Sequence, residues 1–365
     1  MSKRTKSDKL SFPGQSLREA MLYSPLPEKR VRCYLCNRVC TVPDGGLGFC
    51  SVRKNEGGKL YALTYGKACS MAVDPITKKP LAHFYPGALV FSIGAGGCNF
   101  RCEFCDNWMI SQDKGVVGTD LKPEEIVRSA RDNACQGISY TYTEPTIFFE
   151  YAYDTSQLAR QVGFFNTFVT NGYMTREAIH TISPYLDAAT VDFKGGADPE
   201  FYKKFSAVPS VEPIFASLLE MKRHDIHVEI TNLVVSKTGD SLERIRELAV
   251  WIRTKIGKET PFHLLRFHPE YKMIDAVETP IETLEKAYKI SREAGLEYVY
   301  LGNVPGHPYE NTYYPNCHEL LIKRFSFEIV KWNLTKNMQC PACGHSIPIK
   351  GKFEPAGSSH PLPPI

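Results

Sequence analysis

Three cysteines, Cys98, Cys102 and Cys105, are spaced C-x3-C-x2-C directly after an apolar segment that ends in the glycine-rich residues 94–97. Iron–sulfur clusters are normally held by four cysteine thiolates. The next cysteine in the chain is Cys135, so this run offers three protein ligands and leaves one iron of a [4Fe–4S] cluster open. An open iron indicates chemistry at the cluster rather than electron storage alone.

Two other uses of this triplet fit its spacing less well. A structural zinc ion takes four ligands, usually as two separated pairs, and a catalytic zinc ion usually takes three ligands that include histidine. A redox C-x-x-C pair would not need Cys98. The spacing therefore favours an iron–sulfur cluster.

Two further cysteine groups flank the triplet. The first has the spacing C-x2-C-x3-C-x9-C, and structural zinc and a second [4Fe–4S] cluster both suit it. The second group predicts a zinc-ribbon-like tail. Cys69 and Cys135 have no spaced partners and are expected to be buried free thiols. The first group is Cys33, Cys36, Cys40 and Cys50, and the second is Cys317, Cys340 and Cys343.

The bulk composition is that of an ordinary globular protein. The chain has 365 residues, of which 43% are hydrophobic and 23% charged, and its net charge of +4 is too small to indicate nucleic acid or a membrane surface. No signal peptide and no apolar run of membrane-spanning length is visible. Twelve cysteines without an export signal favour metal over disulfides. We therefore expect a cytoplasmic protein.

Short apolar or β-branched runs alternate with helical patterns through the middle of the chain, and Pro123 stands where a helix should begin. This alternation predicts an α/β fold with a parallel sheet. A partial, open (βα)6-type barrel is the first interpretation and a doubly wound open sheet the second. In both, chemistry belongs at the carboxyl ends of the strands. The runs are 88–93, 138–142, 164–169, 188–193, 228–235, 262–267 and 298–301.

The same patterns divide the chain into five parts. A polar arm comes first, a Cys-rich module follows, and the barrel occupies the centre. A zinc-ribbon-like tail and a Pro-rich, disordered end complete the chain. The expected ranges are 1–28, 29–85, 86–305, 306–350 and 351–365.

Polar side chains gather at one end of nearly every expected strand, where an ordinary core would not need them. Because parallel strands bring their carboxyl ends to one edge of a sheet, we expect these side chains to share one site. Beyond the cysteine triplet they are Glu144, Asn171, Asp192, Lys194, Asn232, Arg266, His268 and Asn303.

With Phe104 before its last cysteine, the triplet resembles that of the radical S-adenosylmethionine (SAM) superfamily. The motifs TNG at 170–172, DFK at 192–194 and FHP at 267–269 resemble the branch around the pyruvate formate-lyase activating enzymes. The phrases VDPITKKPLAHFYPG, SYTYTEPTIFFEY and YLGNVPGHPYENTYYPNC are similar to the radical SAM component of the AmmeMemoRadiSam group. This closer resemblance runs from roughly Arg18 to Cys343.

The resemblance implies a mechanism. Three irons would be held by Cys98, Cys102 and Cys105, and SAM would bind the fourth through its amino and carboxylate groups. A reduced cluster would cleave the sulfonium to methionine and a 5′-deoxyadenosyl radical, which would abstract hydrogen from a substrate. The cofactor carries this chemistry and the protein binds and aims it.

The resemblance also implies roles for residues around SAM. Glu144 stands where the family has Gly-Gly-Glu, and would bind the SAM amino group. Its alternative role is that of a helix-entry residue before Pro145. For the other residues the alternatives are strand-end capping or ordinary hydrogen bonding. Those expected near the cofactor are Phe104, Asn171, Asp192, Lys194, Asn232 and His268.

In the family, Cys317 usually has a cysteine partner three residues earlier, where this chain has Tyr314. His318 or His345 could supply a fourth zinc ligand, or the ribbon could persist without metal. We favour zinc with a histidine.

The partners implied are an unidentified substrate and an electron donor such as flavodoxin or ferredoxin. Memo-like and AMMECR-like proteins follow from the family resemblance alone. One alternative function is an activase that installs a glycyl radical on a partner enzyme. Another is a non-catalytic iron–sulfur or zinc protein that relays electrons or docks a partner. An enzyme of the expected kind would bind SAM at its cluster, and a relay would not.

Overall fold

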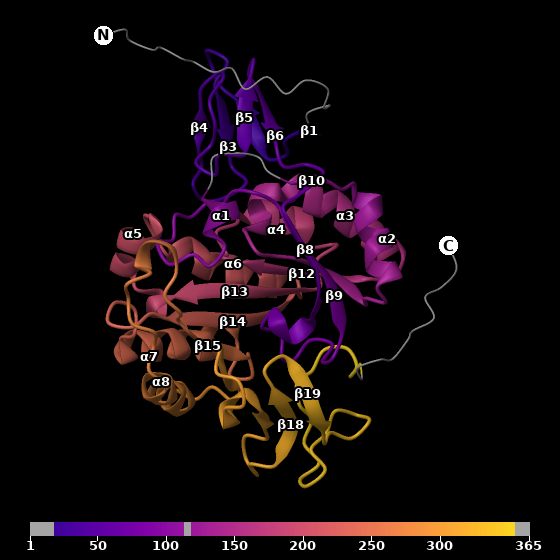
Figure 1. Ribbon diagram of the computed structural model, residues 1–365, viewed down its shortest axis with the longest axis vertical. Coiled ribbons are helices and arrows are strands. Elements are labelled where there is room, and N and C mark those ends of the chain that lie inside the picture. The colour runs from indigo at the N-terminus through magenta and orange to yellow at the C-terminus, as the bar shows by residue number, and fades with distance from the viewer. Residues whose placement is uncertain (1–17, 113–117, 355–365) are drawn as a thin grey trace.

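The computed structural model describes residues 18–112 and 118–354, and its central feature is an eight-stranded sheet (Figure 1). The strand order is β16-β15-β14-β13-β12-β11-β9-β8. Seven strands are parallel, and β8 (Ser70–Pro75) pairs antiparallel with β9 at one edge. The parallel strands are β9 (Leu89–Gly94), β11 (Gly137–Tyr140), β12 (Phe165–Thr170), β13 (Ala188–Lys194), β14 (His227–Val234), β15 (Phe262–Arg266) and β16 (Val299–Gly302).

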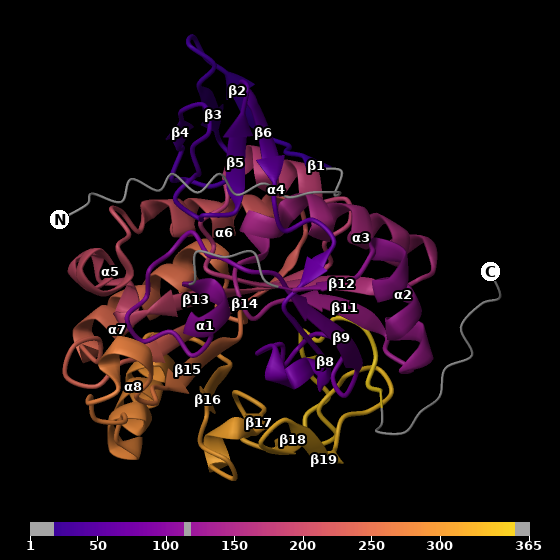
Figure 2. The same cartoon turned by 45° about the horizontal axis from the view of Figure 1, so that its top comes forward.

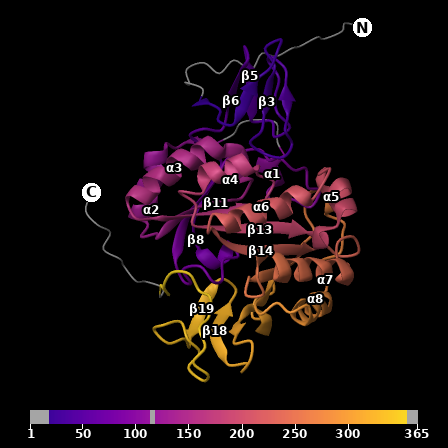
Figure 3. The same cartoon turned by 180° about the vertical axis from the view of Figure 1, so that it is seen from behind.

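The order of the parallel strands decides between the two expected architectures. From β9 to β16 each strand pairs with the next parallel strand along the chain, and the order never reverses. A doubly wound sheet needs a reversal of strand order. Right-handed crossovers in one direction put the helices on one face, which Figure 3 shows. Because β8 and β16 are at opposite edges, the sheet stays open. The expected partial, open barrel is confirmed.

The helices begin and end at ordinary capping signals. Pro123 is the first residue of its helix, as expected, and the Glu125 carboxylate accepts a hydrogen bond from the Lys122 backbone N–H at 2.6 Å. In the described ranges, every helix is too short or too polar to cross a membrane. The helices are α1 (Trp108–Ser111), α2 (Pro123–Asp132), α3 (Phe149–Gln161), α4 (Arg176–Ile182), α5 (Pro199–Ser206), α6 (Glu212–Arg223), α7 (Leu242–Trp251) and α8 (Ile281–Glu293).

The Cys-rich module stands at one end of the barrel and consists of two small antiparallel sheets (Figure 2). Its apolar side chains, including Leu35 and Val52, belong to the same buried cluster as Phe100 and Ile147 of the barrel. Module and barrel therefore share one core. The sheets are β1 (Arg18–Glu19), β6 (Lys59–Ala62) and β5 (Arg53–Glu56), and β2 (Tyr23–Pro25), β3 (Val31–Cys33) and β4 (Thr41–Val42). A further pair joins β7 (Lys67–Ala68) to β10 (Thr119–Asp120).

The tail forms a three-stranded sheet of β17 (Thr312–Tyr313), β18 (Leu320–Phe325) and β19 (Glu328–Trp332). It packs on the last barrel strand, because Tyr298 and Tyr300 share a buried cluster with Leu321 and Ile322.

Three expected boundaries differ from the structure. The described part of the expected arm 1–28 is not free, because β1 and β2 pair with strands of the module. The expected module 29–85 contains β8, which belongs to the barrel sheet. At the other end, Phe353 stacks on Trp332 at 4.2 Å between ring centroids. Phe353, which belongs to the expected disordered end 351–365, is therefore packed. Residues 1–17 and 355–365 lie outside the described ranges.

A buried ion pair fastens the module to the barrel. The Arg53 guanidinium on β5 donates to both carboxylate oxygens of Glu150 on α3, at 3.0 and 2.9 Å. Both side chains are at most 2% exposed. Glu150 also accepts from the Met21 backbone N–H at 2.6 Å, and Arg53 donates to the Met21 carbonyl at 2.7 Å.

We expect Glu150→Gln to lower the free energy of unfolding by about 3–5 kcal/mol, because it leaves the Arg53 charge buried without a counter-ion. Urea unfolding followed by circular dichroism measures this loss. Glu293→Gln is the control, since Glu293 pairs with Arg246 at the surface and should cost below about 1 kcal/mol. Equal losses in the two variants would contradict the role of the buried pair.

Candidate active site

A cavity of about 760 Å³ opens at the carboxyl ends of the parallel strands. Most residues expected at the site line it, so the strand ends converge as the sequence predicted. Its wall includes Cys98, Cys102, Phe104 and Cys105 after β9, Glu144 after β11, Asn171 after β12, Asp192 and Lys194 on β13, and Asn303 after β16.

The cysteine loop after β9 is held by its own arginine and by α5. Arg101 donates to the Cys98 carbonyl at 2.7 Å and also to the Phe49 carbonyl of the N-terminal module. Its backbone N–H donates to the Ser206 carbonyl at 3.0 Å. Phe104 packs on Phe201, with 5.5 Å between ring centroids. The backbone of the loop, Arg101 and Phe104 thereby fix its position.

The three thiols suit metal ligation. Burial raises the pKa of Cys102 to about 11 and also raises the pKa of Cys98 and Cys105. Buried thiols of this kind lose their protons when a metal binds them. The nearest hydroxyls are Ser206, 3.4 Å from the Cys102 sulfur, and Ser111, 3.2 Å from the Cys105 sulfur.

The spacing of these sulfurs separates a cluster from a single ion. Zinc binds sulfur at about 2.3 Å, so the thiolates of a tetrahedral zinc site stand about 3.8 Å apart. Within residues 18–112 and 118–354, the sulfurs of Cys98, Cys102 and Cys105 do not all lie within 4.8 Å of one another. A cluster fits this wider spacing, because each thiolate binds a different iron.

Lys194 is the cation that faces the triplet. Burial alone would lower the pKa of its ammonium group, but the Asp192 carboxylate and the three thiols raise it. The Lys194 nitrogen lies 3.7 Å from a carboxylate oxygen of Asp192, which also accepts a hydrogen bond from Thr231. Lys194 therefore stays charged at neutral pH and can offset negative charge at the triplet or attract a carboxylate.

Glu144 is buried and already well supplied with donors. One oxygen accepts from the Thr146 backbone N–H at 3.0 Å and from the Thr170 hydroxyl at 2.7 Å, and the other from the Asn171 backbone N–H at 2.7 Å. Burial raises the pKa of this carboxyl against these hydrogen bonds. Glu144 caps the short helix Pro145–Phe148, as its alternative role predicts, and still lines the cavity.

Asn171 connects two loops of the site. Its Nδ2 donates to the Asn99 side chain at 2.7 Å and lies 4.0 Å from the Cys98 sulfur. Its side-chain oxygen accepts from the Tyr173 backbone N–H at 3.1 Å. The β12 loop is thereby tied to the cysteine loop.

Two residues expected to bind the cofactor do not line the cavity. Asn232 accepts from the Gly196 backbone N–H at 2.8 Å and does not line the cavity, because its β14 neighbours Thr231 and Leu233 face inward and side chains alternate along a strand. The His268 side chain is 75% exposed and also lies outside the cavity wall.

Arg266, which was also expected at the site, lies on the other face of β15. His263 and Leu265 line the cavity, whereas Arg266 on the other face donates to the Thr279 carbonyl at 2.8 Å. A fully buried strand shows no polar alternation that would reveal its inner face.

The sequence did not predict the residues at the end of the cavity away from the cysteine triplet, which we call its far end. It is lined by Lys79 and by Tyr300, together with Glu310, Arg324 and Phe327 of the tail. Arg324 is buried and donates to the Thr312 hydroxyl at 2.8 Å and the Ala82 carbonyl at 3.2 Å. Only the phrases VDPITKKPLAHFYPG and YLGNVPGHPYENTYYPNC, which contain Lys79, Tyr300 and Glu310, pointed to this end.

Below the cavity, Glu229 organises a buried network. It accepts from the His83 backbone N–H and from the His263 ring, both at 2.7 Å. Burial alone would raise the pKa of Glu229, but the histidine hydrogen bonds hold it well below its usual range. The His83 ring bonds the Tyr300 hydroxyl at 2.6 Å.

The tail thiols form a tighter group than the triplet. The sulfurs of Cys317, Cys340 and Cys343 all lie within 4.8 Å of one another, and the first two are 3.7 Å apart. This is the spacing of a zinc site. Neither His318 nor His345 has a ring nitrogen within the group. The three thiols could hold zinc, but the expected histidine ligand is not in place.

Comparison with known proteins now identifies the family. The radical SAM superfamily model matches residues 92–252. The chain is 48% identical over 336 residues to the uncharacterized protein MJ0808 of Methanocaldococcus jannaschii, covering 91% of this chain and 99% of that protein. The chain belongs to the radical SAM superfamily. Members use a [4Fe–4S] cluster and S-adenosylmethionine, and the triplet fits the cluster.

Two solved structures are similar to this chain at low identity. A radical SAM methyltransferase from Sphaerobacter thermophilus is 17% identical with a TM-score of 0.47, covering 60% of this chain and 68% of that one. A domain of a pyruvate-formate lyase-activating enzyme from Bacteroides vulgatus is 18% identical with a TM-score of 0.40, covering 46% and 99%.

The His83 network predicts acid sensitivity. Burial lowers the pKa of His83 to about 3, so the folded protein keeps this ring neutral while the unfolded chain binds a proton below about pH 6.5. The stability from neutral His83 is present above that pH and is lost as the pH falls towards the folded pKa. Between pH 7.5 and 5.0, we expect the free energy of unfolding of His83→Gln to fall by about 2 kcal/mol less than that of the wild type. Urea unfolding at both pH values measures this.

The control for that comparison is His268→Gln, because His268 is exposed and should leave the pH dependence unchanged. A His83→Gln variant that is as acid-sensitive as the wild type would contradict the account.

For the tail, we expect about one bound zinc ion per chain that Cys340→Ala removes. Plasma emission spectroscopy of dialysed protein measures it. Cys135→Ala is the control, because this thiol is buried away from the group. Unchanged zinc in Cys340→Ala would mean that the tail thiols do not hold the metal.

Proposed function

We propose that this protein is an oxidoreductase of the radical SAM type that abstracts a hydrogen atom from a small substrate bound beside the triplet. One observation supports it above the others: three thiols and a charged Lys194 face one cavity at the strand ends. When bound, the cluster and SAM supply an electron, sulfonium cleavage to methionine, and a 5′-deoxyadenosyl radical. The electron comes from a one-electron donor such as flavodoxin or ferredoxin.

The residues of the chain bind and orient. Cys98, Cys102 and Cys105 would hold three irons and leave the fourth without a protein ligand. Lys194 offers a cation for the SAM carboxylate, and Asp192, 3.7 Å away, offers an acceptor for its amino group. Glu144 already accepts hydrogen bonds from Asn171 and Thr146, so we propose that it positions these loops rather than binding the amino group alone.

The far end of the cavity is the proposed substrate site. The whole cavity, which would also hold the cluster and SAM, has a volume of about 760 Å³, within the range of small-molecule sites, and the tail residues Arg324 and Phe327 form part of its wall. These features favour a small substrate over a loop of a folded partner. The glycyl-radical activase stays the second candidate, since the TNG, DFK and FHP motifs support it.

The reconstituted, reduced protein should convert SAM to methionine and 5′-deoxyadenosine, measured by liquid chromatography and mass spectrometry. We expect Cys98→Ala to abolish both products. Failure of the wild type to form either product would contradict the function. Formation of a glycyl radical on a partner protein would instead establish the activase.

Lys194→Met should raise the KM for SAM by roughly 10–100-fold, because a charge-assisted contact to a carboxylate contributes about 1.5–3 kcal/mol. Initial rates of 5′-deoxyadenosine formation against SAM concentration measure it. Lys203→Met on the exposed face of α5 is the matched control. An unchanged KM in Lys194→Met would remove Lys194 from the SAM site.

A further inference from the structure

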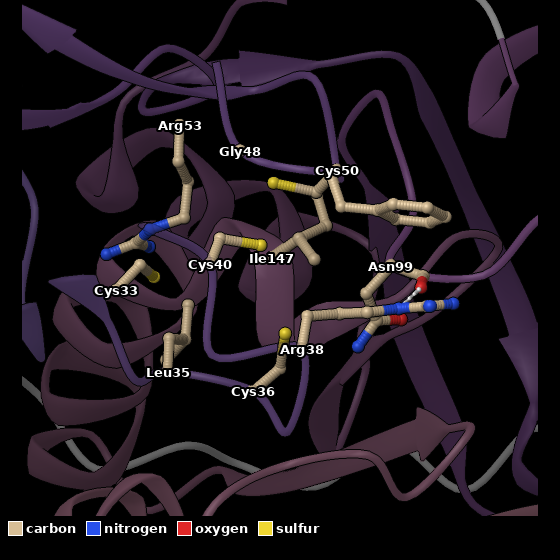
Figure 4. A pocket seen from close by; sticks show the side chains of 11 residues that line it. Cys33, Leu35, Cys36, Arg38, Cys40, Gly48, Cys50, Arg53, Asn99 and Ile147 are labelled. Atoms are coloured by element: carbon tan, nitrogen blue, oxygen red, sulfur yellow. Dashed lines mark hydrogen bonds between the residues drawn. The ribbon is translucent and has the colours of Figure 1, made fainter. Parts of the chain in front are cut away.

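The four cysteines of the N-terminal module surround one cavity that the proposed function does not use. Cys33, Cys36, Cys40 and Cys50 all line it, and Figure 4 shows their sulfurs directed towards a common space. All four are free thiols, and three of them are buried. Four thiols around one cavity indicate a metal centre with a complete set of protein ligands.

The spacing of the sulfurs distinguishes zinc from a cluster. Among the residues that the structure describes, only the tail thiols form a group of three or more ligand atoms within 4.8 Å. No three of the four module thiols come so close, although a zinc site would bring them to about 3.8 Å from one another. The tail, where two sulfurs are 3.7 Å apart, shows zinc spacing within the same chain.

Two arginines, the buried Arg53 and the half-buried Arg38, line the cavity and carry donors for a negatively charged group. Within the described part of the chain, Nη2 of Arg38 and Nε of Arg53 are buried without a hydrogen-bond partner. Four thiolates and a cluster core carry net negative charge, and sulfurs of a cluster accept N–H hydrogen bonds. The arginines therefore indicate an anionic centre, and the sulfur spacing favours a cluster over a zinc ion.

This cavity adjoins the cysteine triplet. Asn99, the residue after Cys98, lines it, and Arg38 donates to the Asn99 carbonyl at 2.9 Å. Gly97 has a φ of +90°, and a Cβ there would lie 2.8 Å from the Cys50 carbonyl oxygen. The two cysteine loops are thus in direct contact, and only a glycine permits this approach.

We propose that Cys33, Cys36, Cys40 and Cys50 hold a second [4Fe–4S] cluster that passes single electrons to the cluster at Cys98, Cys102 and Cys105. Its four protein ligands leave no iron open for SAM, so its chemistry is electron transfer. In each transfer the second cluster is oxidised by one electron and the first is reduced by one. A flavodoxin- or ferredoxin-type donor then reduces the second cluster again. The relay rests on the proposed function, whereas the cluster does not.

Metal analysis tests the site without any activity. In the anaerobically reconstituted variant Cys98→Ala/Cys102→Ala/Cys105→Ala, we expect about four irons and four sulfides per chain. After reduction, its electron paramagnetic resonance signal should not respond to SAM. Adding Cys36→Ala and Cys50→Ala should remove this iron, whereas adding Cys69→Ala and Cys135→Ala should not. A triple variant that contains no iron and two zinc ions per chain would overturn the proposal.

The wild-type protein provides a second measurement if the triple variant does not fold. About eight irons and one zinc per chain support the proposal, and about four irons and two zincs contradict it.

The relay has its own test. Cys36→Ala/Cys50→Ala should still cleave SAM when dithionite, a small reductant, supplies the electrons. With reduced flavodoxin, its rate of SAM cleavage should be at least tenfold lower than that of the wild type. If the variant keeps the same fraction of the wild-type rate with both reductants, the relay is overturned, whereas the proposal of a second cluster is not affected. If the wild type cleaves no SAM with either reductant, the proposed function fails, while the iron count still decides the second cluster.

Discussion

The contact between the two cysteine loops is the constraint on which the rest of the site depends. Arg101 donates to the carbonyls of Cys98 and Phe49, and Arg38 donates to the carbonyl of Asn99. The Phe49 ring lies between the two guanidinium groups, 3.9 and 4.4 Å from their central carbons. The triplet loop is therefore held by backbone carbonyls and cation–π contacts, which leaves its thiols free to bind iron.

The barrel and the tail complete the site from the other side. Because seven parallel strands follow one another without reversal, their carboxyl ends bring Lys194, Asp192 and Asn171 to the same cavity as the triplet. The tail packs on β16 and contributes Arg324 to the far wall. On the proposed function, the chain would separate three tasks: electron supply in the module, radical chemistry at the strand ends, and substrate binding towards the tail.

Much of this could be predicted from local patterns, because each buried strand is an apolar run that ends in a polar residue. The inner face of a strand could not be predicted, as Asn232 and Arg266 show, since a strand buried on both faces has no polar side. Arg324 could not be predicted to line the cavity either, because its position depends on how the tail packs. The glycine-rich residues 94–97 also did not reveal that Gly97 lies against the Cys50 loop, because this contact joins segments far apart in the chain.

The most direct test of the account is the electron paramagnetic resonance spectrum of the reduced Cys36→Ala/Cys50→Ala protein, recorded with and without SAM. This variant should retain only the cluster at Cys98, Cys102 and Cys105. The account predicts a [4Fe–4S]⁺ signal whose shape changes when SAM is added, because SAM binds the open iron. A signal that is identical with and without SAM would contradict the assignment of this cavity as the active site.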